Sequence, residues 1–122
     1  MSVAYRQIEP GDNLEIAELI RGVFREFGVD RPGTVYTDPT TDHLFELFRH
    51  PRSVYWIAIA DGVMAGGCGI YPTPRLPEGC GELVKFYLAA PYRGQGTGRH
   101  LMEICFESAR QLGFRQLYLE SF

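Results

Sequence analysis

The sequence predicts an α/β fold, in which strands and helices alternate within one domain spanning residues 1–122, and three features predict it. The chain has 122 residues, 45% of them hydrophobic and 13% aromatic, which is typical of a globular domain with a substantial core. The dipeptide Asp61-Gly62 lies between two apolar segments and predicts a hairpin of antiparallel strands. The C-terminal segments follow the order strand, helix, strand, which predicts a parallel crossover.

Hydrophobic periodicity places the individual elements. Runs of β-branched and aromatic residues predict strands over residues 3–8, 53–60, 63–71, 83–88 and 115–122. Apolar residues at a spacing of about 3.6 predict helices over residues 12–27, 41–48 and 99–112. Asp12 is placed to cap the first helix and Gly28 to end it. The second helix ends before Pro51, because proline disfavours the helical conformation in the residue before it.

Two further segments are unusual for their position. Gly66, Gly67 and Gly69 lie inside a predicted strand, which indicates a bulge or the close approach of another backbone or a ligand. The loop over residues 29–39 is rich in proline and glycine, and loops of this length in compact domains are often functional. Tyr36 and its neighbours therefore either line a substrate entrance or simply cover the core.

Charge and cysteine usage limit the class of protein. A net charge of −3 argues weakly against a nucleic-acid-binding protein, which normally presents a basic face. The three cysteines are odd in number and form no C-x-x-C pair, so we expect reduced thiols and no zinc site. The three histidines show no metal-ligand spacing, so we expect no metal. The sequence has neither a signal peptide nor an apolar run of membrane-spanning length, so we expect no membrane partner and a soluble, cytoplasmic protein.

The segment Arg93-Gly94-Gln95-Gly96-Thr97-Gly98 carries the strongest functional signal. Its glycines alternate with other residues where a helix must begin, and glycine allows both positive φ and close approach of a ligand. A helix N-terminus offers unpaired N–H groups that bind phosphate, and Arg93 and Arg99 add charge. This segment, with Arg99, is called the cradle below. The spacing fails the dinucleotide fingerprint G-x-G-x-x-G and the P-loop pattern, and a purely structural tight turn is the alternative.

Arg93, Gly96 and Gly98, which follow an apolar strand and precede a helix, resemble the acetyl-CoA loop [QR]-x-x-G-x-[GA] of the GNAT-type N-acetyltransferases, and Gly94 adds their common extra glycine. The order of elements resembles that family along the whole chain. The resemblance implies a central mixed, mostly antiparallel sheet flanked by helices, and acetyl-CoA as the cofactor. It implies that CoA contacts the three strand residues before the loop and the whole cradle: Phe86, Tyr87, Leu88, Arg93, Gly94, Gln95, Gly96, Thr97, Gly98 and Arg99.

The resemblance also implies an activity, the transfer of an acetyl group from acetyl-CoA to a primary amine by direct attack in a ternary complex. The backbone N–H of Leu88 would then donate to the thioester oxygen, and Glu82 would be the general base. A carboxylate partly withdrawn from water suits that role, whereas an exposed glutamate at the strand edge is the alternative. No cysteine lies beside an obvious base, so we expect no acyl-enzyme.

The chain departs from the family pattern at its end. GNAT-type domains normally continue with another helix and two more strands, whereas this sequence ends at Phe122. A missing segment would leave the last strand as an unpaired edge, which favours association in a homodimer or with a second chain. Supply of the segment by another chain, truncation and degeneration all remain open. An inactive acetyl-CoA-binding module is therefore the alternative function, and the acceptor, a small-molecule or a peptide amine, is not identified.

Overall fold

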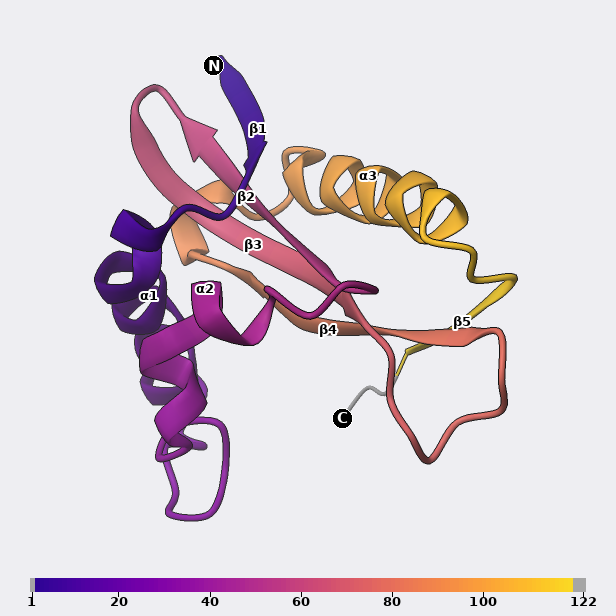
Figure 1. The fold of residues 1–122 in the computed structure, drawn as a ribbon. Coiled ribbons are helices and arrows are strands. Elements are labelled where there is room, and N and C mark those ends of the chain that lie inside the picture. The colour runs from indigo at the N-terminus through magenta and orange to yellow at the C-terminus, as the bar shows by residue number, and fades with distance from the viewer. Residues whose placement is uncertain (1, 120–122) are drawn as a thin grey trace.

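The computed structural model describes residues 2–119, which form a five-stranded sheet flanked by helices (Figure 1). The strands are β1 Val3–Gln7, β2 Val54–Ala60, β3 Val63–Tyr71, β4 Cys80–Leu88 and β5 Gln116–Leu119. The helices are α1 Asn13–Glu26, α2 Leu44–Leu47 and α3 Thr97–Gln111, with short 3-10 helices at Pro10–Asp12, Pro39–His43 and Ala90–Tyr92. The strand order is β1-β2-β3-β4-β5, antiparallel throughout except for the parallel pair β4–β5. The predicted mixed, mostly antiparallel sheet is confirmed.

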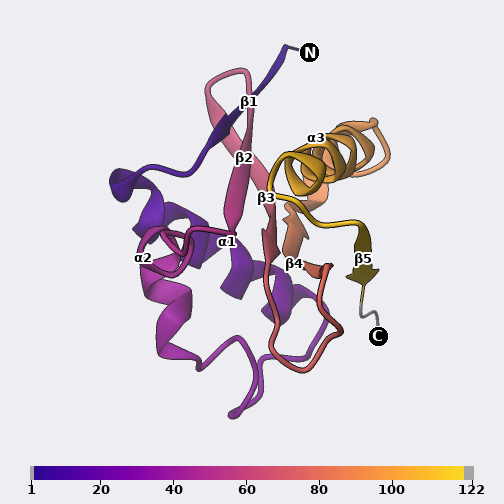
Figure 2. The same cartoon turned by 45° about the vertical axis from the view of Figure 1, so that its right-hand side comes forward.

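The sheet separates two apolar layers. Figures 1 and 2 show α1 and α2 on one face and α3 on the other. The first layer contains buried residues of α1, α2 and the facing strands, namely Ile16, Ile20, Phe24, Leu44, Tyr55 and Ile57. The second contains buried residues of α3 and its facing strands, namely Leu101, Cys105, Ala109, Cys68, Ile70 and Leu83. The helices α1 and α3 therefore each bury apolar residues on the face that their sequence periodicity predicts.

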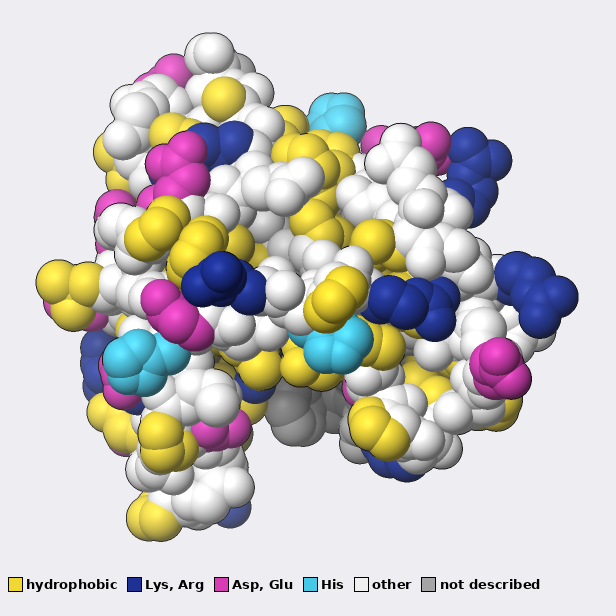
Figure 3. Space-filling view, in the orientation of Figure 1, with side chains coloured by type: hydrophobic (Ala, Val, Ile, Leu, Met, Phe, Trp, Pro, Cys, Tyr) yellow, Lys and Arg dark blue, Asp and Glu magenta, His cyan; other side chains and the backbone are white. Residues whose placement is uncertain are grey.

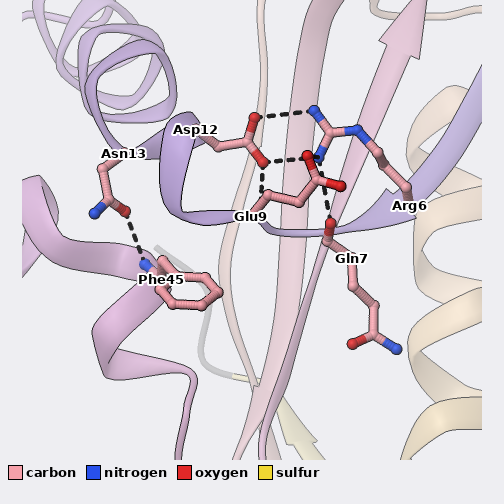
Figure 4. Close-up of polar contacts among 6 residues, drawn as sticks. All are labelled: Arg6, Gln7, Glu9, Asp12, Asn13 and Phe45. Carbon is pink, nitrogen blue, oxygen red and sulfur yellow. Dashed lines mark hydrogen bonds and ion pairs between the residues drawn. The ribbon is translucent and has the colours of Figure 1, made fainter.

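The start of α1 is fixed by an ion pair and not by the simple cap predicted for Asp12 (Figure 4). The Asp12 carboxylate accepts from the Arg6 guanidinium at 2.7 and 2.9 Å and from the backbone N–H of Glu9 at 2.8 Å. Asn13 then links α1 to α2, because its Oδ1 accepts the backbone N–H of Phe45 at 2.8 Å. Asp12 is the N-cap residue of α1, as predicted, but its side chain makes no capping hydrogen bond to α1, because its oxygens accept from Arg6 and from the N–H of Glu9.

Several predicted boundaries also differ, and β4 begins at Cys80, three residues before the predicted start. The helix predicted over residues 41–48 is a 3-10 helix, Pro39–His43, followed by the single-turn α2. Pro39 can begin a helix because its fixed φ suits the first position, so the turn begins two residues earlier than predicted. The last strand covers Gln116–Leu119, so Arg115 precedes it, and residues 120–122 of the predicted segment lie outside the described residues.

A bulge in β4 confirms the interpretation of the glycines in β3. Gly69 pairs with Val84 and Gly67 with Tyr87, so β4 contains one residue more than β3 across this interval. Lys85 takes a positive φ of 53° there. A bulge of this kind shifts the side-chain alternation by one position. Leu83, before the bulge, packs toward α3, as does Phe86 after it, while Val84 and Tyr87 pack toward α1.

Candidate active site

The cradle offers a row of unpaired N–H groups at the start of α3. The backbone N–H groups of Gly94 to Arg99 have no hydrogen-bond partner among residues 2–119, and the first N–H bond of the helix runs from His100 to the carbonyl of Gly96 at 3.0 Å. Gly94 and Gly96 have φ of 73° and 87°. A Cβ at either position would meet no atom within 4 Å, so the surface above them is open. These features allow an anion to reach the backbone.

Gly98 is required for a different reason, which is packing. A Cβ at Gly98 would lie 3.0 Å from Cδ1 of Leu88 and 3.2 Å from Cζ of Phe86. The first turn of α3 therefore rests directly on the end of β4. This contact fixes the position of the cradle relative to the strand that precedes it.

The C-terminal half of β4 has an edge that β5 leaves open within the described residues. β5 pairs with β4 only from Cys80 to Leu83. The N–H of Ala89 donates to the carbonyl of Ala65 in β3 at 2.9 Å. Since N–H groups of successive extended residues point to opposite edges, the N–H of Leu88 points away from β3, toward the open edge. The geometry thus leaves a backbone donor on the side from which β4 and β5 diverge.

The Arg93 side chain is engaged inside the protein. Its guanidinium donates to the carbonyl of Leu88 at 2.8 and 3.0 Å and to the carboxylate of Glu26 at 2.7 and 2.9 Å. It also stacks over the ring of Phe27, 5.0 Å from the centroid. The hydrogen bond from Arg93 holds the pKa of Glu26 below its usual value. Arg93 therefore joins the end of α1 to the end of β4, and the free groups of the cradle are mainly backbone groups.

The other side chains of the cradle have different surroundings. Gln95 donates to the carbonyl of Pro91 at 2.9 Å. Thr97 is buried. The side chain of Arg99 is 84% exposed and lies 3.8 Å from the carboxylate of Glu103. Contact between Arg99 and a bound anion stays a prediction from the sequence.

Tyr87 and Glu82 lie on the α1 side of β4. Burial raises the pKa of Tyr87 to about 12, so its phenol stays protonated at neutral pH. The side chain of Glu82 is 12% exposed, so it is not the exposed edge residue of the alternative interpretation. One of its oxygens accepts from the hydroxyl of Thr73 at 2.5 Å and the other from the guanidinium of Arg75 at 3.1 Å. Glu82 is therefore a sheltered carboxylate with both oxygens engaged.

A pocket of about 270 Å³ opens beside Glu82. Figure 3 shows the molecule hollowed between the α1–α2 side and the side of the loop that precedes β4. The pocket is lined by residues of the α1–α2 connection, α2, β3, β4 and the β3–β4 loop: Asp38, Thr40, Leu47, Phe48, Tyr71, Thr73, Glu82, Val84 and Lys85. Sequence reasoning missed Asp38 and Lys85. Strict alternation places Lys85 on the opposite face from Glu82 and Val84, and only the bulge reverses this.

The loop between α1 and α2 has a mixed role. Tyr36 is held against α1, because its carbonyl accepts from Arg21 at 3.0 Å and its hydroxyl from Arg25 at 3.2 Å. The loop reaches the pocket only at its end, through Asp38. Tyr36 therefore covers the helix, and a residue two positions later lines the pocket.

The described residues contain neither a metal-ligand cluster nor a membrane-spanning helix. No cluster of three histidine, cysteine or acidic residues among residues 2–119 is arranged to hold a metal ion. None of the helices in that range is both long and apolar enough to cross a membrane.

Comparison with known proteins identifies the family. The sequence profile of the acetyltransferase (GNAT) family matches residues 16–122. The chain belongs to the GNAT acetyltransferase family. This GNAT domain is 34% identical over 121 residues to the uncharacterized N-acetyltransferase YjgM of Escherichia coli, a match that covers 98% of this chain and 72% of the relative.

Solved structures show the same fold. A GNAT-family acetyltransferase of Staphylococcus aureus superposes with a TM-score of 0.84 at 17% identity, covering 99% of this chain and 74% of the other. A predicted acetyltransferase of Clostridium acetobutylicum, solved with acetyl-CoA, gives a TM-score of 0.77 at 16% identity, covering 98% and 81%. The GNAT fold of the chain is therefore shown both by its sequence and by its architecture.

Proposed function

We propose that this GNAT domain, acting as a single unit over residues 1–122, transfers the acetyl group of acetyl-CoA to a primary amine by direct attack in a ternary complex. The observation that carries the proposal is the cradle: consecutive unpaired N–H groups from Gly94 to Arg99 at the N-terminus of α3. Such a row binds phosphate oxygens without needing charged side chains. The Clostridium acetobutylicum relative, solved with acetyl-CoA, supports the same ligand for this chain.

The residues present fit acetyl-CoA. The open surface over Gly94 and Gly96 admits a diphosphate to the backbone, and the Arg93–Glu26 pair holds the loop in place. The extended arm of the cofactor suits the edge of β4 along Phe86, Tyr87 and Leu88, which lacks a strand partner among the described residues. When bound, acetyl-CoA supplies an activated acyl group as a thioester.

The chain itself would contribute two groups to the reaction. The N–H of Leu88 would donate to the thioester oxygen, and one preorganised donor of this kind commonly lowers a barrier by about 3 kcal/mol. An amine attacks only when neutral, while a lysine-like amine has a pKa of about 10.4, so a base must take its proton. Glu82 is the base we propose, directly or through water, because it lines the pocket beside β4.

The free thiols of Cys68, Cys80 and Cys105 suit a reducing compartment, which favours the cytoplasm.

A second candidate is a CoA-binding module without transfer. The contacts of Glu82 favour it, because one carboxylate oxygen already accepts from Thr73 and the other from Arg75, so an acceptor amine must displace a partner to reach either oxygen. In this case the cradle keeps its ligand, but the pocket deprotonates no amine.

Calorimetric titration with acetyl-CoA, followed by a thiol-release assay with a panel of amines, tests both candidates. We expect saturable binding, and a variant Gly96→Val that binds no acetyl-CoA, because a β-branched residue is strained at a φ of 87°. The control is Gly33→Val, which carries similar strain at φ 84° in the loop beyond α1 and should keep its affinity. Binding with thiol release at background selects the module, and the absence of binding refutes both candidates.

A further inference from the structure

Lys85 occupies the most irregular position in β4. It is the only lysine in the 122 residues, and it takes a positive φ of 53° that residues other than glycine rarely adopt. The bulge places Lys85 in the pocket beside Glu82 and Val84, where a regular strand would direct it to the α3 face. Strained residues held by their surroundings are frequently functional.

The surrounding structure holds Lys85 in this conformation. The hydroxyl of Tyr55 donates to the carbonyl of Lys85 at 2.7 Å, and the Tyr55 side chain is fully buried. Its ring fills the space over Gly67 and Gly69, where an added Cβ would lie 2.5 and 2.6 Å from ring carbons. The bulge is therefore supported by one buried tyrosine and two glycines in the neighbouring strands.

The ammonium of Lys85 has no hydrogen-bond or ion-pair partner in the part of the chain that the structure describes. The side chain is half-buried, yet it makes no hydrogen bond or ion pair with any of residues 2–119. Desolvation lowers its pKa, and the nearby carboxylates of Asp38 and Glu82 oppose this effect. Those carboxylates are already engaged, Asp38 by Thr40 at 2.9 Å and Glu82 by its two neighbours described above. A cation withdrawn from water without a partner favours an external anion.

We propose that Lys85 binds an anionic group on the acceptor, so that the acceptor is a small amine that also carries a carboxylate or a phosphate. The inference rests on the proposed acetyl transfer and narrows its substrate class. Lys85, Asp38 and Glu82 all line one pocket. The carboxylates of Asp38 and Glu82 attract the ammonium end of such a molecule, and the ammonium of Lys85 attracts its anionic end. A volume of about 270 Å³ equals roughly nine water molecules, which suits a molecule of amino-acid size.

Matched acceptor pairs test the proposal. Glycine is compared with glycinamide, and phosphoethanolamine with ethanolamine, each by kcat/KM, so that the carboxylate and the phosphate are scored separately. We expect the wild type to prefer the anionic member of at least one pair by about tenfold or more, as a charge-assisted hydrogen bond gives. Lys85→Met should remove that preference and Lys85→Arg keep it. The control Arg110→Met removes an equal charge from the exposed face of α3 and should keep it as well.

Chemical modification gives a readout that does not depend on turnover. Because Lys85 is the only lysine, peptide mass spectrometry assigns side-chain amine acetylation by an N-hydroxysuccinimide ester to a single position. With CoA present, the preferred anionic member should slow labelling of Lys85, and its neutral partner should not. Equal protection by both members of each pair, or equal kcat/KM values, overturns the proposal. If no amine is acetylated while selective protection persists, the transfer reaction fails and the anion site stands.

Discussion

The hydrogen bond from Tyr55 to the carbonyl of Lys85 predicts a measurable link between the sheet interior and the pocket. The change Tyr55→Phe keeps the ring that fills the space over Gly67 and Gly69 and removes only the hydroxyl, which donates at 2.7 Å. Loss of one buried neutral hydrogen bond, with its carbonyl left without that donor, costs about 1–2 kcal/mol. With a urea m-value of about 1.5 kcal/mol/M, the unfolding midpoint should fall by about 1 M.

The assay is urea unfolding followed by tryptophan fluorescence, together with acceptor kinetics. The control Tyr36→Phe removes a hydroxyl that accepts from Arg25 at the surface, and it should change stability by less than about 0.5 kcal/mol. Because the bulge orients Lys85, Tyr55→Phe should also raise the KM for the acceptor more than the KM for acetyl-CoA. A variant with the stability of the wild type and unaltered acceptor KM would refute the idea that Tyr55 holds the bulge.

Three further predictions concern the cradle, the base and the ion pair of α1. Gly98→Val should destabilise the fold by about 1–3 kcal/mol and weaken acetyl-CoA binding, because the added side chain enters the space of Leu88. Urea unfolding measures the stability and calorimetry the binding. The control Gly11→Val, which has no atom within 4 Å of its Cβ, should change neither quantity. Glu82→Gln should lower turnover about 100-fold at neutral pH and leave acetyl-CoA affinity intact, and an unchanged pH–rate profile would exclude the base. The Arg6 hydrogen bonds lower the pKa of Asp12, so stability from this pair is present above the unfolded pKa of about 3.9 and disappears as the pH falls through the folded value. The variant Asp12→Asn should therefore have a lower urea midpoint than the wild type at pH 6. The two midpoints should converge in acid.

Much of the donor side of the site could be predicted from the sequence. The alternating glycines of the cradle indicated a turn that needs positive φ or close approach, and Gly94 and Gly96 take positive φ. The reason is local, because a turn that requires positive φ strongly favours glycine, so the glycine pattern predicts the backbone conformation directly. Gly28 and Gly113, placed after the helices, follow the same logic.

The acceptor side could not be predicted, because it depends on contacts between distant segments. A shift of one residue in β4 decides which face carries Lys85, and the hydroxyl of Tyr55, on β2, contacts this bulge from across β3. The engagement of Arg93 by Glu26 joins residues 67 positions apart, and no local pattern predicts it. The sequence therefore predicts the backbone of the cradle well and the pocket poorly.

The arrangement of β4 explains how the two halves of the site keep a fixed separation. On the α3 face, Phe86 and Leu88 support Gly98 and with it the first turn of the cradle. On the other face, the same strand carries Glu82 and Lys85 into the pocket. A single strand, paired with β3 from Glu82 to Leu88, thus sets the distance between the cradle and the pocket. Sites carried on strands are held more tightly than sites on loops. The bulge is the point at which this strand directs two successive residues, Val84 and Lys85, to the acceptor side, so disturbing it should affect the acceptor before the cofactor.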